Sequence, residues 1–417
     1  MMLTEDRRSK PHFDVTLLLI MYLLMFLGII AIAVATFNPE VSGDAPLLSR
    51  ILLSESGRWQ AIFVLASPAA VWFLVSVPYE HFRSYARLYY IVVLGMLGVV
   101  LIASTAIRGV SSWLELSLGR MIQPAEFAKI AIILMLARTM ANNPRPMNTA
   151  KDAVRTILIF AVPAGITVMQ GEVGSVIVMT MIFYIMLYFG GADWKWLTFM
   201  FVVGALAVGA FFIYGMISGS TDFRLQRMLS FLDPQKYFNS AGYQIINSER
   251  AIGSGGLTGV GLFVPGSMSQ LNYVPEDWTD FVFATIGEAV GFVGSTLIVL
   301  LYFALLVRML YLARFTYDKF GRMIIIGVLA MMFIHVFQNI AMTIGLMPIT
   351  GIPLPFLSYG GSNLLTNVIG VSLVLNVVKN RSTAVPTFSM PVTLTAPAHK
   401  RVRKKKKVYV NVASGDE

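Results

Sequence analysis

Cysteine is absent from this 417-residue chain, and charged residues make up only 13% of it. The first absence excludes disulfide bonds, thiolate metal sites and a cysteine nucleophile. Four histidines also leave little material for a histidine-rich metal centre. A soluble domain carries about 25% charged residues, whereas this chain is 56% hydrophobic with a mean hydropathy of +0.71. The composition therefore predicts a polytopic membrane protein.

Long uncharged apolar runs recur along the chain, and a membrane-spanning helix needs roughly 20 such residues. The first run is too long for the apolar core of a cleaved signal, and no small-residue cleavage site is evident. We predict an all-α fold with ten transmembrane helices. The predicted spans are 15–36, 59–78, 88–107, 122–140, 156–169, 173–188, 196–217, 281–307, 323–347 and 364–378. The fifth and sixth are separated only by Gln170-Gly171-Glu172, so they form either a tight hairpin or one broken span.

Basic residues are distributed unevenly about these spans. Most of the 32 Lys and Arg residues fall on the side that holds both termini, which predicts cytoplasmic termini. Merging the fifth and sixth spans would weaken this bias, so the bias favours ten. We predict a cytoplasmic N-terminus over 1–14, a membrane domain over 15–380 and a disordered basic cytoplasmic tail over 381–417. The tail is expected to contact anionic inner-leaflet lipid rather than nucleic acid, despite the net charge of +10.

The segment between the predicted seventh and eighth helices, 218–279, is a long extracytoplasmic loop. Its length of about sixty residues is too great for a mere connection. It carries Arg224, Arg227 and Gln244, followed by a glycine-rich stretch over 253–261. Glycines permit sharp turns and close approach of the backbone to a ligand, but no Gly-Lys-Ser/Thr follows as a P-loop requires. Flexible re-entrant structure is therefore favoured over phosphate binding.

A second unusual segment, 345–363, joins the predicted ninth and tenth helices. Its prolines and glycines exclude a continuous helix. Irregular backbone at membrane depth is tolerated only when it is buried in protein or lines a wet cavity. We therefore predict a re-entrant Pro/Gly-rich element beside a polar site.

Glu126 and Lys129 are opposite charges at the start of the predicted fourth span. They are three residues apart and so share one helix face, and Pro124 suits the first turn of that helix. Opposite charges that enter a membrane together are expected to pair. The residues alone leave two interpretations open: a packing ion pair, or the wall of a polar cavity that receives a charged substrate.

Asp280 stands where the long polar loop meets an apolar run, at the expected edge of the bilayer. It is either the N-cap of the eighth helix or a catalyst, and spacing alone favours the cap. Glu288 lies eight residues on, about 12 Å deeper and roughly 80° around the helix, which does not fit a facing pair of glycosidase carboxylates. A catalytic Asp280 would therefore act as a single base. His335 is interpreted as a satisfied histidine within the bundle.

Several motifs in order resemble the SEDS family, the RodA/FtsW/SpoVE group of peptidoglycan glycosyltransferases. The resemblance extends from about Asp14 to Asn380. The motifs are QPAEFAK at 123–129, GYQ at 242–244 with AIGSGG at 251–256, TDFVFA at 279–284 and PITGIPLPFLSYGGS at 348–362. Ser112 and Trp278 depart from it, because a basic residue and a histidine are common at these positions.

The resemblance implies polymerisation of lipid II at the outer face of the bacterial cytoplasmic membrane. It makes Asp280 the counterpart of the family's essential aspartate. Trp113, Glu126 and Lys129 are then counterparts of positions tied to its central cavity. A class B penicillin-binding protein, a single-span transpeptidase, is the implied partner.

The implied donor is a sugar on polyprenyl pyrophosphate, and the acceptor is the 4-hydroxyl of a second lipid II. A hydroxyl is a poor nucleophile, so Asp280 would accept its proton as general base in one inverting displacement. The leaving pyrophosphate needs cations, and a divalent ion such as Mg²⁺ or Mn²⁺ is one candidate. The basic candidates are Arg108, Lys129, Arg224 and Arg227. Further candidate substrate contacts are Glu172, Gln244 and Ser358.

Two other functions fit parts of the sequence. A flippase or transporter of lipid-linked precursors would also have many spans and intramembrane charges, although no internal repeat is detectable. An inactive scaffold that recruits a transpeptidase is the third possibility, and the intact Asp280 argues against it.

Overall fold

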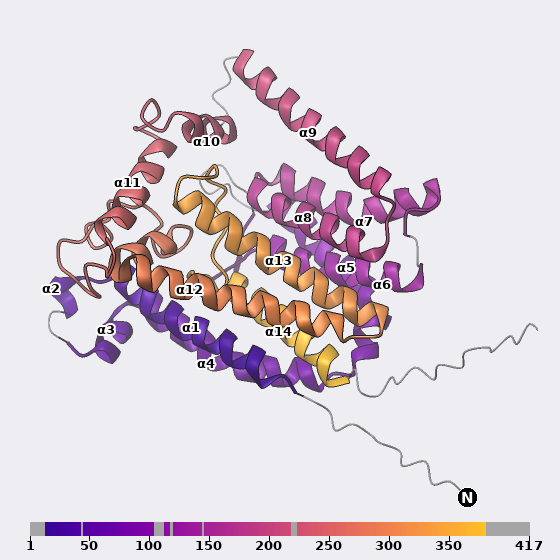
Figure 1. Ribbon diagram of the computed structural model, residues 1–417, viewed down its shortest axis with the longest axis horizontal. Helices are drawn as coiled ribbons and strands as arrows, with labels where there is room; N and C mark the ends of the chain where they lie inside the picture. Colours follow the sequence, from indigo (N-terminus) through magenta and orange to yellow (C-terminus); the bar gives the residue numbers. More distant parts are fainter. Residues whose placement is uncertain are drawn as a thin grey trace, which may run out of the picture. The chain divides into compact units, whose positions relative to one another are not determined.

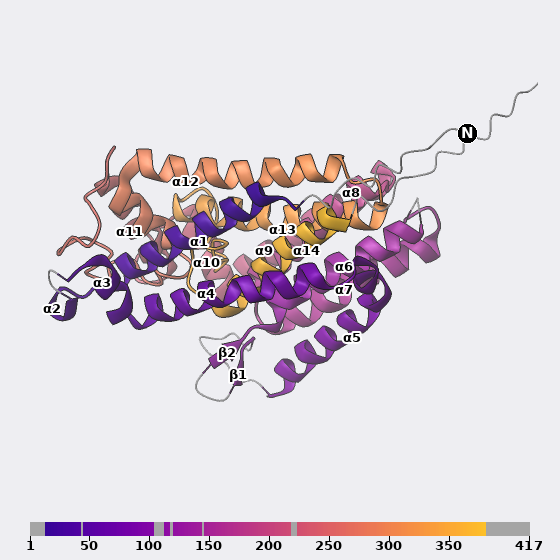
Figure 2. The ribbon, with the colours of Figure 1, turned by 90° about the horizontal axis from the view of Figure 1, so that it is seen from below.

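Helices dominate the computed structural model, which describes residues 13–42, 45–103, 112–116, 120–143, 146–217 and 223–380 (Figure 1). The long helices are α1 (Val15–Ala35), α4 (Glu55–Ser76), α5 (Tyr79–Ala103), α6 (Pro124–Asn142), α7 (Ala150–Met169), α8 (Val173–Gly190), α9 (Trp194–Ile217), α12 (Val282–Arg314), α13 (Lys319–Thr343) and α14 (Gly361–Asn380). Shorter helices are α2 (Pro39–Ser42), α3 (Leu47–Leu53), α10 (Phe223–Leu232) and α11 (Ala241–Ser254). An antiparallel ribbon of β1 (Leu114–Leu116) and β2 (Arg120–Ile122) precedes α6 (Figure 2). The mainly helical fold is confirmed, and the short ribbon was not predicted.

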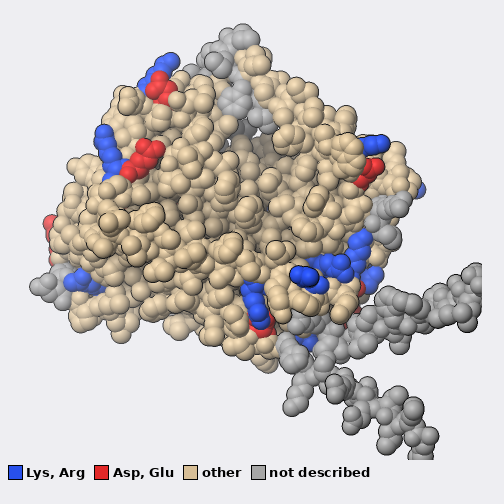
Figure 3. All heavy atoms as spheres, viewed as in Figure 1, with Lys and Arg blue, Asp and Glu red and all other residues tan. Residues whose placement is uncertain are grey.

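Within the described part of the chain, eight helices are long and apolar enough to cross a membrane: α1, α4, α5, α7, α8, α12, α13 and α14. The chain is therefore a multi-pass membrane protein. In Figure 3 a broad uncharged area separates charged side chains that gather toward its margins. The other two predicted spans fall on α6, which carries charged residues, and on α9, whose apolar stretch is Trp194–Ala207. The number of ten remains a prediction.

The predicted fifth and sixth spans form a hairpin. Helix α7 ends at Met169, α8 begins at Val173, and the two helices pack together. Gly171 in the turn has φ of +93°, a left-handed conformation that glycine adopts without steric cost. The alternative of one broken span is thereby excluded.

The centre of the bundle is formed by α13 and α14. In their apolar windows 78% and 83% of the residues are buried. Helix α13 packs against α6, α8, α12 and α14, so that nearly every face of it is covered by protein. A polar side chain on α13 must consequently find its partner within the protein.

The long loop before α12 is structured by α10 and α11, which differs from the flexible structure predicted for it. Its glycines serve backbone packing: a Cβ on Gly255 or Gly259 would lie 2.0 Å or 2.2 Å from carbonyl oxygens of α12. We predicted that the backbone at these glycines would approach a ligand closely, whereas in the structure it approaches helix α12. This contact fixes the loop against the start of α12.

The Pro/Gly-rich segment, residues 344–360, contains neither helix nor strand. Its side chains Leu354, Phe356 and Leu357 are fully buried. Its backbone also abuts Gly28 of α1 and Gly174 of α8 so closely that neither glycine could carry a Cβ without displacement. The segment is therefore irregular and buried in protein, as predicted. Its re-entrant path within a membrane remains a prediction.

Candidate active site

Asp280 is not the N-cap of α12. The helix begins at Val282, its N-cap is Phe281, and no side chain makes a capping hydrogen bond there. The cap interpretation, which spacing alone favoured, is wrong. Asp280 lies two residues before the helix and is only partly buried, so its carboxylate is not committed to the helix terminus.

Three consecutive carbonyl groups at this motif each accept a hydrogen bond from another part of the fold. The donors are the Tyr359 amide to Trp278 O at 2.9 Å, Ser358 Oγ to Thr279 O at 2.6 Å and Asn339 Nδ2 to Asp280 O at 2.7 Å. Two donors come from the Pro/Gly-rich segment and one from α13. The backbone of the Asp280 motif is consequently fixed from two sides.

Ser358 is fully buried, and its hydroxyl is occupied by protein groups. It donates to Thr279 O and accepts from the Leu354 amide at 2.8 Å. The residue predicted as a substrate contact thus connects the Pro/Gly-rich segment to the Asp280 motif. Its observed position is that of a support for the motif.

Arg227 of α10 lies near the Asp280 carboxylate. A Cβ placed on Gly351 would lie 3.2 Å from Asp280 Oδ2 and 3.7 Å from Arg227 Nη1, so both atoms border one point. Gly351 has φ of +69°, which a side chain would strain. The carboxylate, the guanidinium and the bare glycine backbone therefore meet at one place, although they come from three segments of the chain.

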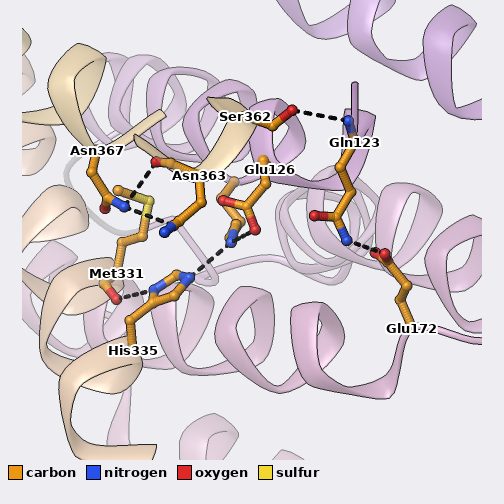
Figure 4. Close-up of polar contacts among 9 residues, drawn as sticks. Gln123, Glu126, Glu172, Met331, His335, Ser362, Asn363 and Asn367 are labelled. Carbon is orange, nitrogen blue, oxygen red and sulfur yellow. Dashed lines mark hydrogen bonds and ion pairs between the residues drawn. The ribbon is translucent and has the colours of Figure 1, made fainter. Parts of the chain in front are cut away.

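Glu126 and Lys129 form the predicted ion pair, and His335 joins it; Figure 4 shows Glu126 and His335 on either side of this contact. Lys129 Nζ lies 2.6 Å from Glu126 Oε1 and 2.8 Å from His335 Nε2. His335 Nδ1 lies 2.6 Å from Met331 O, so we assign the proton to Nδ1 and an acceptor role to Nε2. Lys129 is 1% exposed, which leaves its charge enclosed by these partners. The interpretation of His335 as a satisfied histidine is confirmed.

Helix α13 connects this ion pair to Asp280. His335 and Asn339 are four residues apart, on one face and about 6 Å apart along the axis. Asn339 Nδ2 also donates to Ile352 O at 2.8 Å, so one amide holds both Asp280 and the Pro/Gly-rich segment. We did not predict a role for Asn339, and its signal in the sequence is an amide within an apolar span.

Glu172 lies at the α7–α8 turn and accepts a hydrogen bond from Gln123 Nε2, while the Gln123 backbone donates to Ser362 Oγ at 3.2 Å (Figure 4). Burial raises the pKa of the Glu172 carboxyl above its ordinary value, and the Ser112 hydroxyl and Gln123 amide oppose this rise. These contacts join the starts of α6, α8 and α14. Glu172 therefore stands within reach of the Glu126–Lys129 pair.

Polar atoms around this pair are buried without a hydrogen-bond partner of good geometry among the described residues. They are Ser112 Oγ, Glu126 Oε2, Glu172 Oε2, Asn363 Nδ2, Thr366 Oγ1 and Asn367 Oδ1. Each such group costs roughly 1–3 kcal/mol when it stays unsatisfied. The region around Glu126 and Lys129 is consequently suited to bind molecules that form hydrogen bonds, such as water or the polar part of a substrate.

The remaining predicted site residues lie on other elements. Gln244 is half-buried on α11, and Trp113 is 36% exposed just before β1. Arg224 belongs to α10, where only its backbone is described. Arg108 lies outside the described residues. All four stay predictions as substrate contacts.

Asp277 is a buried carboxyl that we did not single out from the sequence. It is 0% exposed, and neither carboxylate oxygen has a hydrogen-bond partner of good geometry among the described residues. Burial, with smaller contributions from Glu288 and Glu276, raises the pKa of Asp277 to about 8. Glu288 itself accepts hydrogen bonds from the Met268 amide and from the amide and hydroxyl of Ser269. Glu288 therefore fixes the loop, whereas burial favours the protonated form of Asp277.

These features define a polytopic membrane protein with a partly buried carboxylate beside an arginine and an enclosed ion pair within its helices. A family model described as "Cell cycle protein", for the FtsW, RodA and SpoVE proteins, matches residues 14–383. The chain belongs to this family.

Relatives and solved structures agree with this assignment. The chain is 32% identical over 373 residues to a protein named peptidoglycan glycosyltransferase MrdB from Escherichia coli K12, covering 89% of this chain and 95% of that one. It is 32% identical over 374 residues to stage V sporulation protein E of Bacillus subtilis, covering 89% and 98%. RodA of Thermus thermophilus has the same fold, with a TM-score of 0.64 at 24% identity over 88% and 97% of the two chains. A chain from a peptidoglycan synthase complex, whose title concerns coordinated polymerization and crosslinking, gives 0.70 at 24% over 88% and 98%.

Proposed function

We propose that this protein is a peptidoglycan glycosyltransferase that polymerises lipid II into glycan strands at the outer face of the bacterial cytoplasmic membrane. The observation that carries the proposal is the Asp280 carboxylate, held by a fixed backbone beside Arg227. The relative MrdB, which bears the name peptidoglycan glycosyltransferase, shares 32% identity over 89% of this chain. This similarity supports the same activity here.

In the proposed reaction Asp280 is the general base. The 4-hydroxyl oxygen of the acceptor attacks the anomeric carbon of the donor, and its proton passes to the Asp280 carboxylate. The bond from the anomeric carbon to the pyrophosphate oxygen breaks, and the leaving group keeps the electron pair. A single displacement inverts the anomeric configuration. General-base assistance of this kind contributes about 10²- to 10⁴-fold in rate.

Among the side chains that the structure describes, Arg227 is well placed to meet the leaving group. Its Nη1 and Asp280 Oδ2 border the same point beside Gly351, so acceptor and pyrophosphate can be held by adjacent groups. A pyrophosphate binds the planar guanidinium through paired hydrogen bonds. Gly351 supports this arrangement because a side chain there would fill the point where the two groups meet.

Lys129 is a less direct cation, since Glu126 and His335 enclose it. We infer that its charge maintains the polar interior in which Glu126 Oε2 and Glu172 Oε2 remain available as acceptors. Sugar hydroxyls are donors that match such acceptors. The proposed role of Glu126, Lys129 and Glu172 is thus to bind the polar part of a lipid-linked sugar.

A divalent cation is proposed only as a companion of the substrate. Among the described residues, no three His, Asp or Glu side chains form a group that could hold a metal ion. Mg²⁺ is commonly bound through substrate phosphates with one or two carboxylates, so Mg²⁺ or Mn²⁺ would enter with the pyrophosphate. No step of the reaction above is routed through it.

The proposed partner is a class B penicillin-binding protein, whose transpeptidase would cross-link the new strands. A chain of similar fold was solved in work on a peptidoglycan synthase complex, which supports such a pairing. We propose further that both termini face the cytoplasm and that the tail over 381–417 contacts anionic lipid. This orientation puts Asp280 on the outer side, where the new strand is needed.

The test compares Asp280→Asn with Asp233→Asn, an exposed carboxylate on the same long loop. Each protein is purified with its transpeptidase partner and given lipid II. We expect Asp280→Asn to lower polymerisation at least about 100-fold and Asp233→Asn to leave it unchanged, with equal thermal stability for both.

Unchanged polymerisation by Asp280→Asn would contradict its role as general base. A parallel assay in liposomes without the partner measures lipid II translocation. Translocation without polymer, insensitive to Asp280→Asn, would replace the proposal with a flippase.

A further inference from the structure

Four arginines from three helices gather at the end of the bundle that holds Asp14. Arg83 and Arg87 are on the first turns of α5, Arg138 is on the last turns of α6, and Arg155 is near the start of α7. These three helices pack together and lie along one side of the bundle in Figure 2. Arg138 is within electrostatic reach of the other three guanidinium groups. The cluster is therefore one site rather than four separate charges.

Neutral groups hold two of the four arginines in place. Arg83 Nη2 donates to Asn142 Oδ1 at 3.0 Å, and Arg138 Nη1 donates to Ser84 O at 3.0 Å. These two bonds tie the start of α5 to the end of α6. Each uses one donor of a guanidinium that has five, so most donors of both side chains stay available.

The cluster contrasts with a compensated arginine at the same end of the bundle. Arg308 makes three hydrogen bonds to the Asp14 carboxylate, the shortest at 2.7 Å. Within the described residues, none of the four clustered arginines forms an ion pair with a carboxylate. The positive-inside rule explains basic residues at this end, but it does not require them to be packed together without ion pairs to carboxylates.

An apolar surface continues from the arginines along α5 and α7. Leu88, Ile91 and Val92 of α5 are 53%, 64% and 53% exposed, and Val154 and Leu158 of α7 are 56% and 51% exposed. Tyr90 Oη of α5 donates to Ile159 O of α7 at 3.0 Å, which holds the two helices side by side. A ligand at the arginines thus has an adjoining surface for acyl chains.

We propose that this cluster binds the headgroup of an anionic phospholipid whose acyl chains lie along α5 and α7. Charge complementarity identifies the occupant, because uncompensated guanidinium groups at a membrane surface attract lipid phosphates. Arg pairs with phosphate through two parallel hydrogen bonds, so four arginines suit a phospholipid with two phosphates better than one with a single phosphate. The site is separate from Asp280 and independent of the proposed reaction.

The test measures lipid binding by the full-length protein in nanodiscs and by native mass spectrometry, with cardiolipin, phosphatidylglycerol and phosphatidylcholine as probes. The variant Arg87→Gln with Arg155→Gln removes two exposed charges and keeps the hydrogen-bonded Arg83 and Arg138. The matched control, Lys195→Gln with Arg314→Gln, removes two exposed charges on other helices near the same end. At about 1 kcal/mol per charge, we expect the first variant to bind cardiolipin roughly 10- to 30-fold more weakly.

The expected order of affinity for the wild type is cardiolipin, phosphatidylglycerol and then phosphatidylcholine, and the control should weaken cardiolipin binding less than about 3-fold. If the two double variants lose cardiolipin affinity equally, general surface charge explains the binding and the proposed site is contradicted. Equal binding of phosphatidylcholine and cardiolipin would overturn it as well. Glycerol phosphate without chains serves as a further probe, and its binding as tightly as the lipid would refute a lipid site.

Discussion

The Asp280 motif and the Glu126–Lys129 pair keep charge in the fold by opposite means. At the motif, other segments bind the backbone carbonyls of residues 278–280, and the carboxylate stays partly exposed. At the pair, side-chain charges satisfy one another and are sealed from solvent. The first arrangement fixes the backbone that carries the carboxylate. The second uses its charges to make a polar interior stable.

The comparison teaches that a reactive group can be positioned through the backbone that carries it. A carboxylate that accepts a proton must keep an oxygen accessible to the acceptor. Lys129, in contrast, has Nζ contacts to Glu126 and His335 within hydrogen-bond distance. Variants that disturb one region and spare the other can test this difference.

Loss of Lys129 should have the largest effect on stability. Lys129→Met leaves Glu126 buried without its counter-charge, which typically costs about 3–5 kcal/mol. Replacing both charges, as in Lys129→Met with Glu126→Gln, should recover most of this loss because an uncharged pair leaves no isolated ion. Thermal unfolding in mixed micelles measures both variants. A double variant as unstable as the single one would show that the pair does not act through charge compensation.

The pH dependence of stability should depend on Asp277. Its pKa is about 8 when folded and near the ordinary value of 3.8 when unfolded, so the folded state binds an extra proton between these values. Its contribution to stability is fully present below pH 4, declines as the pH rises and is lost above pH 8. Asp277→Asn should flatten this decline and raise the free energy of unfolding at pH 7 by roughly 4 kcal/mol.

The measurement for Asp277 is thermal unfolding between pH 5 and pH 9, with the exposed Asp233→Asn as matched control. Asp233→Asn should keep the wild-type slope. If Asp277→Asn has the wild-type slope too, another group carries the pH dependence, and the buried acid is stabilised by contacts that the structure does not show.

Much of the fold was predictable because membrane-spanning helices appear in the sequence as long apolar runs. Each of the ten predicted ranges overlaps a long helix among the described residues, and the Glu126–Lys129 pair followed from a spacing of three on one helix. The hairpin at Gly171 needed the structure, since the spacing permitted both alternatives. Span identification succeeded where the signal was local, in hydropathy and in helix periodicity.

The site was less predictable because its contacts join distant segments. Asn339 and Asp280 are 59 residues apart, and no periodicity relates them. Arg227 is brought near Asp280 by a loop that was expected to be flexible, and the cap interpretation failed because α12 begins two residues later. Asp277 was missed because its burial depends on how that loop packs. Tertiary contacts of this kind leave no local pattern in one sequence.

Asn339→Leu should have the smallest effect on stability and a specific effect on activity. It removes two hydrogen bonds, to Asp280 O and Ile352 O, while keeping a side chain of similar size. We expect a loss of about 2 kcal/mol in stability. Polymerisation should fall through kcat with little change in KM, because the carboxylate shifts while the substrate-binding groups remain.

The matched control is His335→Leu, one turn away on the same face of α13, which disturbs Lys129 and should raise KM for lipid II. If both variants lower kcat alike, the two regions are not separable, and the fixed backbone has no role beyond general packing of α13.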